Sequence, residues 1–118
     1  MAIQRQDGWA NDSAVGDADL TGKERRFVTR TSTGIRLAQN GEQVAGVLQE
    51  GKAAALRSSF AVAGFPLKVI ASQTITVGQA IQAGADGTAI VGTTNQVGVA
   101  RNGCNSGEMV EVMVDRVS

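Results

Sequence analysis

Apolar side chains recur at every second position through much of residues 67–114. The pattern is clearest in residues 109–114, which read Met-Val-Glu-Val-Met-Val. Successive side chains of a strand point to opposite sides of a sheet, so this period predicts strands with one buried face. The dipeptide Asp86-Gly87 predicts a hairpin turn, and residues 97–100 are expected to pair with residues 109–114.

The segment before residue 67 continues the strand pattern with shorter pieces. Residues 35–38 predict a strand that ends at the turn signal Asn40-Gly41, and residues 43–48 resume the strand character. Residues 52–57 have high helix propensity, but the sequence that follows is strand-like, so we expect a strand over residues 56–62. We therefore predict an all-β fold, a small antiparallel β-barrel or sandwich whose body covers residues 35–118.

Residues 43–48 and 96–100 resemble each other. The first segment reads Gln-Val-Ala-Gly-Val-Leu and the second reads Gln-Val-Gly-Val-Ala. Each is followed by a loop containing glycine and then by a further predicted strand. We interpret this similarity as a duplicated strand–loop–strand unit rather than as a solenoid repeat.

Residues 1–34 have a different composition. One Arg stands against four Asp in residues 1–22, whereas five basic side chains stand against one Glu in residues 23–36. Apolar positions are sparse and follow neither the helix nor the strand period, so the segment cannot offset its own ordering entropy by burial. We predict an extended N-terminal arm over residues 1–34 that becomes ordered on a neighbouring protein.

Partner contacts are expected in this arm and at one edge of the body. The only tryptophan is either folded back onto the barrel or an anchor in a pocket of a partner. The basic cluster is either solvated or in contact with an acidic surface of that partner. The candidate partner-binding residues are Trp9, Lys23, Arg25, Arg26, Phe27, Arg30, Phe65 and Pro66.

Composition excludes several classes of function. The chain has 118 residues, 11 basic and 11 acidic, and a net charge of zero. Nucleic-acid binding requires an excess of Lys and Arg, so we expect no nucleic-acid partner. Apolar segments are too short to span a bilayer, and we expect neither a membrane partner nor a signal peptide. The chain has one Cys and no His, so we expect no disulfide, no metal and no cofactor, and synthesis in a reducing compartment.

Catalytic residues are also missing from the pattern. A hydrolase triad requires a base that titrates near neutral pH, and His is absent. Cys104 lies in a predicted loop as an inert residue, and Glu108 and Glu111 point to opposite faces of a strand. Lys68 resembles the modified lysine of biotinyl or lipoyl domains, but it lies within a strand pattern rather than at a hairpin tip. We expect no catalytic residues and no enzymatic activity.

The order of these segments resembles that of the small capsid decoration, or cement, proteins of tailed bacteriophages. The resemblance covers about residues 41–116 and departs from the family pattern in the Ala-rich residues 52–60. The segments that carry it are residues 43–48, 67–71, 75–81, 84–89, 96–100 and 107–114.

This resemblance implies a virion structural protein on the outer capsid surface. It implies a homotrimer that clamps the major capsid protein at local three-fold positions, with terminal arms taking part. We expect such a protein to stabilise the capsid by binding, without any reaction. The alternative is a carbohydrate-binding or surface-binding β module displayed on a virion, although one Trp and no Tyr weigh against stacked sugar rings.

Overall fold

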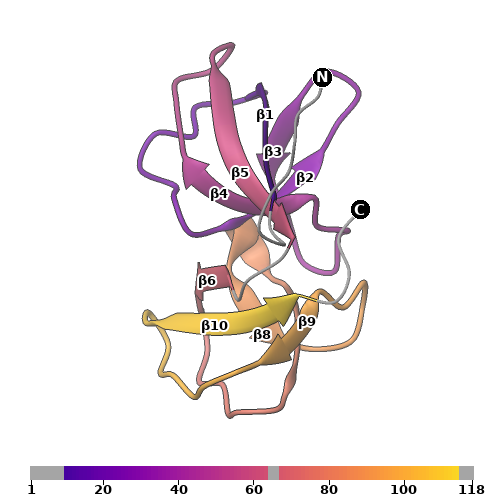
Figure 1. Ribbon diagram of the computed structural model, residues 1–118, viewed down its shortest axis with the longest axis vertical. Helices are drawn as coiled ribbons and strands as arrows, with labels where there is room; N and C mark the ends of the chain where they lie inside the picture. The colour runs from indigo at the N-terminus through magenta and orange to yellow at the C-terminus, as the bar shows by residue number, and fades with distance from the viewer. Residues whose placement is uncertain (1–9, 64–66, 115–118) are drawn as a thin grey trace.

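The computed structural model describes residues 10–63 and 67–114, and it is an all-β structure in two parts. Over these residues the strands form two five-stranded antiparallel sheets, as the sequence pattern predicts. We name residues 10–63 the first unit and residues 67–114 the second unit. Figure 1 shows the first unit above the second along the longest axis of the molecule.

The strands alternate with short loops in both units. The first unit contains β1 (Ala10–Val15), β2 (Phe27–Arg30), β3 (Ile35–Leu37), β4 (Gly46–Glu50) and β5 (Arg57–Ala63). The second unit contains β6 (Leu67–Ile70), β7 (Ala80–Ala83), β8 (Ala89–Val91), β9 (Gly98–Ala100) and β10 (Met109–Val114). A 3₁₀ turn, η1 (Ala85–Gly87), connects β7 to β8.

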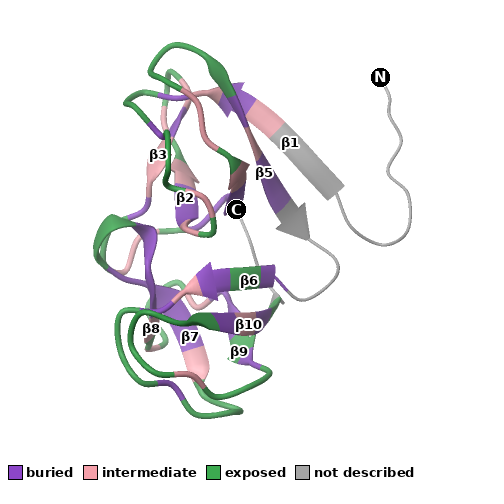
Figure 2. Ribbon diagram, turned by 90° about the vertical axis from the view of Figure 1, so that its left-hand side faces the viewer, coloured by how far each residue is buried: buried purple, intermediate pink, exposed green. Residues whose placement is uncertain are grey.

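The strand pattern of residues 67–114 is confirmed. Strand β9 pairs with β10, and β7 pairs with β8 across the Asp86-Gly87 turn. Val110 and Val112 are buried, whereas Met109 and Met113 are 46% and 42% exposed. Figure 2 shows the same alternation in β6, where the exposed Lys68 separates two buried residues. The strand expected over residues 56–62 is also present, as β5.

The predicted arm differs from the structure over its described part. From residue 10 onward the chain belongs to the first sheet, where β1 pairs with β5 and β2 lies between β3 and β4. The sparse apolar residues of this segment are sufficient because they occupy central positions: Leu20, Phe27 and Val28 are at most 1% exposed. Short strands gain most of their stability from such packing against distant segments, which composition does not reveal.

The two units have the same topology. The first sheet has the order β1-β5-β4-β2-β3, and the second has the order β6-β10-β9-β7-β8, which is the same order shifted by five strands. Parallel bridges join the outer strands in the same way, through Gly16 and Ile35 in the first unit and Ala71 and Ala89 in the second. Each sheet therefore curls until its two edges meet, as in a small barrel.

The equivalence of the units extends to the pairing register. The pair Val28–Leu37 in the first unit corresponds to Ile81–Val91 in the second. Side chains at equivalent positions form the apolar interior of each unit. Those of the first unit are Ala14, Leu20, Val28, Ile35, Ala45, Leu48 and Phe60, and those of the second are Val69, Ile75, Ile81, Ala89, Val97, Ala100 and Val112.

The sequence similarity between residues 43–48 and 96–100 lies on equivalent strands. Gly46 and Gly98 occupy the same register position, opposite Val28 and Ile81 respectively. A Cβ atom on Gly46 would lie 2.3 Å from the carbonyl oxygen of Ala61, so this position requires glycine. The duplicated unit is therefore a whole five-stranded barrel, larger than the strand–loop–strand unit that the sequence predicts.

Candidate interaction surface

The two units are joined by an apolar contact that buries one face of the first sheet. We name this the junction face, and its residues belong to the same packed cluster as the interior of the second unit. They are Phe27, Ala38, Val44, Val47 and Ala61, each at most 3% exposed. Backbone hydrogen bonds from Gly87 N to Ala38 O (2.6 Å) and from Ile70 N to Arg25 O (2.8 Å) tie the units together at this contact.

Phe27 was predicted to bind a partner, and the structure corrects this prediction. Its side chain is fully buried in the junction face, so it has no surface to offer another protein. A bulky aromatic residue next to a basic cluster resembles an interface anchor in sequence. Only the packing of the second unit against β2 identifies it as a core residue.

The predicted basic residues do not form one cluster. Arg26 is half-buried at the junction, where its guanidinium donates to the carbonyl oxygen of Asp86 (3.2 Å). Arg30 lies at the other end of β2, with its guanidinium carbon 5.2 Å from the ring centroid of Phe60. Lys23 and Arg25 are exposed in the loop between β1 and β2. Trp9, Phe65 and Pro66 lie outside the described residues.

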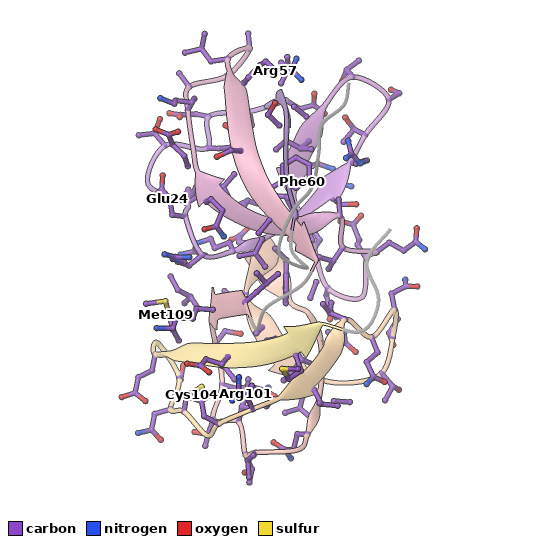
Figure 3. The ribbon with its side chains drawn as sticks, in the orientation of Figure 1. Glu24, Arg57, Phe60, Arg101, Cys104 and Met109 are labelled. Carbon is purple, nitrogen blue, oxygen red and sulfur yellow. The ribbon has the colours of Figure 1, made fainter. Side chains whose placement is uncertain are left out.

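Arg25 lies beside an apolar part of the second unit. Its carbonyl oxygen accepts the backbone N–H of Ile70, and Ile70 is directly opposite Met109 in the sheet. We name Arg25, Ile70 and Met109 the seam patch, because it spans the line where the two units meet. Figure 3 shows Met109 on the outside of the second unit, on the same side of the molecule as Glu24.

Local hydrogen bonds hold the seam patch in position. Arg25 has a backbone φ of 68°, in the left-handed region, and its guanidinium donates to the Gln49 side chain (3.1 Å). The neighbouring Glu24 carboxylate accepts the backbone N–H of Gly51 (2.9 Å), and this bond lowers the pKa of Glu24. Arginine and methionine are both enriched in protein–protein interfaces, so this patch has the composition of a binding surface.

An ion pair fixes the loop that follows β3. The Arg36 guanidinium donates two hydrogen bonds to the Glu42 carboxylate, each 2.8 Å long, and the Gln39 backbone N–H donates a third. The hydrogen bonds from Arg36 and then from Gln39 lower the pKa of Glu42 to about 2. This loop reaches the second unit through the bond from Gly41 N to Ala83 O (3.0 Å), so the pair also supports the junction.

Two side chains that could react or bind a metal ion, Cys104 and Asp17, are half-buried or hydrogen-bonded within the fold. Burial raises the pKa of the half-buried Cys104 thiol, which keeps it protonated at neutral pH. Asp17 accepts hydrogen bonds from the hydroxyls of Thr31 and Thr33, which lower the pKa of its carboxyl group. Within residues 10–63 and 67–114, acidic and Cys side chains do not form a group of three that could hold a metal ion. The described part of the chain also contains no helix suited in length and polarity to crossing a membrane.

The fold is similar to that of a bacteriophage protein. The N base of the head fibre protein gp8.5 of bacteriophage phi29 matches 93% of this chain and 97% of its own chain, with a TM-score of 0.77 and 18% sequence identity. At this identity the likeness concerns the fold alone. No protein-family model and no curated protein sequence matches this chain.

The seam patch was only partly predictable from sequence. Arg25 was among the predicted residues and is exposed in the seam patch. Met109 and Ile70 were assigned to strands without a role, because the alternation that marks a strand does not show what lies beside its outer face. The sequence did contain a sign of an exposed role for Met109, because the apolar alternation along β10 places this large apolar residue on the solvent-facing side of the strand.

Proposed function

We propose that this chain is a virion structural protein of a tailed bacteriophage, a decoration subunit that binds the outer surface of the head. The observation that supports this proposal best is the fold similarity, which extends over nearly the whole chain, to a protein described as the base of a phage head fibre. The order of strand and turn segments in the sequence independently resembles that of capsid decoration proteins.

The major capsid protein is the proposed partner, and the seam patch is the proposed contact surface. Met109 would supply apolar contact area, and Arg25, with the nearby Lys23, would contact acidic groups on the capsid. A typical protein–protein interface covers about 800 Å² of each partner. That is about one seventh of the 5831 Å² accessible surface of this chain, so the contact would extend beyond the seam patch.

The proposed effect on the capsid is stabilisation by binding. A protein that binds the assembled shell but not its separated subunits stabilises the shell by RT ln(1 + [L]/Kd), which is about 2.7 kcal/mol per site at a concentration 100 times the Kd. The firmly connected junction suits this role, because a rigid subunit loses little conformational entropy on binding. Self-association as a homotrimer and contacts from residues 1–9, including Trp9, belong to the same proposal.

Co-sedimentation with phage heads tests the proposal. Heads of the phage that encodes this chain, prepared without it, should bind the purified protein, and their disassembly temperature should rise. The substitutions Arg25→Glu and Met109→Lys should each weaken binding by at least about tenfold, a loss of about 1.4 kcal/mol. Arg101→Glu changes the same charge on an exposed loop of the second unit and should leave binding unchanged.

Two results would contradict this proposal. One is the absence of binding to the heads at any stage of maturation. The other is specific binding of the protein to a glycan array, which would favour a carbohydrate-binding module. If the heads bind but Arg101→Glu weakens binding as much as Arg25→Glu, the role of the seam patch is wrong while the decoration role stands.

A further inference from the structure

Among residues 10–63 and 67–114, the duplication leaves one apolar face of the second unit without the cover that its equivalent in the first unit has. The junction face of the first unit packs against the second unit. Register and backbone hydrogen bonds identify the corresponding positions of the second unit, which we name the open face. The open face consists of Ala80, Gly92, Gln96, Val99 and Met113. These residues correspond, in that order, to Phe27, Ala38, Val44, Val47 and Ala61 of the junction face.

The two equivalent faces differ sharply in exposure. Every residue of the junction face is at most 3% exposed. On the open face Val99 is 37% exposed and Met113 is 42% exposed, and the other three residues are half-buried. Val99 and Met113 are directly opposite each other on β9 and β10, and Val99 is also opposite Ala80 on β7. The open face is therefore one continuous surface across three neighbouring strands.

The structure also indicates what kind of surface covers such a face. In the first unit the cover is one end of a five-stranded barrel of the same topology, where β6 ends at Ile70 and η1 connects two strands. Gly87 in η1 approaches so closely that a Cβ atom on it would lie 2.5 Å from the carbonyl oxygen of Phe27. The matching end of the first unit carries Val15, at the end of β1, and the β2–β3 hairpin loop at residues 31–34, in which Ser32 and Thr33 are exposed.

We propose that the open face binds the first unit of a second copy of this chain, in a head-to-tail contact that repeats the contact inside each chain. This proposal rests on the proposed function for its setting, the self-association of decoration subunits on a capsid. The contact is heterologous, with two different surfaces meeting, so it closes into a ring when the rotation between copies permits. Compared with the junction face, the open face has smaller residues at two positions (Ala80 and Gly92) and a more polar residue at a third (Gln96), so the contact is weaker than the junction and depends on protein concentration.

Sedimentation equilibrium of the full chain with matched variants tests this inference. The intact chain should self-associate as its concentration rises. Met113→Lys should raise the dissociation constant at least tenfold, because it places a charge within the apolar contact. Val77→Lys also places a lysine at an exposed apolar residue of the second unit, but Val77, which is 62% exposed, lies outside both the open face and the seam patch, so the constant should change less than twofold. Val99→Ala provides a milder variant with an intermediate effect if Met113→Lys does not fold.

A photo-crosslinking residue in place of Met113 identifies the occupant directly. The expected product joins position 113 of one copy to the segment containing Val15 or residues 31–34 of another. A chain that stays monomeric at all concentrations, equal effects of the two lysine substitutions, or crosslinks to another segment would overturn the inference. If the decoration role were wrong, the protein would not bind heads, but it would still self-associate and Met113→Lys would still weaken that association. Failure of the decoration role is therefore distinguishable from failure of this inference.

Discussion

Replacing Phe27 with alanine separates the two roles that this residue could have. Phe27 is fully buried between the two units, where Val47 and Ala61 of its own sheet and the second unit surround it. Truncation of a buried Phe to Ala costs about 3–5 kcal/mol, through lost transfer free energy and the remaining cavity. Both sheets hold the walls of this cavity in place, so we expect a value of about 4 kcal/mol, a large part of the about 5–15 kcal/mol that stabilises a typical domain.

Urea denaturation measures this effect. With a slope of about 2 kcal/mol per molar urea, Phe27→Ala should lower the unfolding midpoint by about 2 M. Val77→Ala is the matched control, because Val77 is 62% exposed and its truncation should change stability by less than about 0.5 kcal/mol. If Phe27→Ala costs less than about 1 kcal/mol, Phe27 is not part of a packed junction. If it also reduced binding to heads without loss of stability, Phe27 would be the partner anchor that the sequence predicted.

Three further predictions test the junction and its surroundings. Glu42→Gln should cost about 1 kcal/mol of stability at pH 7 in chemical denaturation, whereas Glu50→Gln should cost little. The folded-state pKa of Glu42, about 2, is below its ordinary value of 4.5, so this contribution to stability is full above about pH 4.5 and is lost as the pH falls through 2. An equal cost of Glu42→Gln at pH 7 and at pH 1.5 would contradict this prediction. Gly87→Ala should lower the melting temperature more than Gly78→Ala, since both have positive φ but only Gly87 lies against backbone, and equal effects would exclude a tight contact there. Cys104 should react with a disulfide reagent at pH 7.5 more slowly in the folded protein than in urea, and equal rates would show that its burial does not protect the thiol.

Local patterns were sufficient to predict the strands of the second unit. Apolar alternation in residues 109–114 and the Asp86-Gly87 turn depend on neighbouring residues and on a period of two, so a single sequence carries them. The same holds for β5, where the Ala-rich residues before it have helix propensity but the strand pattern prevails. The sequence also contained a trace of the duplication, in the matching glycine and valine at positions 46–47 and 98–99.

The arm and the role of Phe27 were mispredicted because they depend on distant residues. Residues 10–30 look too polar to fold, yet β1 and β2 gain their stability from β5, β4 and the second unit. Likewise, Arg25 and Met109 are 84 positions apart in the chain, and only the pairing of β6 with β10 brings them to one patch.

Alternation and turn residues act over a few positions, so the sequence alone predicts short antiparallel strands with an aliphatic interior. Which apolar residues are core and which are surface depends on how the two units pack. Equivalent residues such as Val47 and Val99 have the same local pattern, and they differ in burial only because a second barrel covers the first of them.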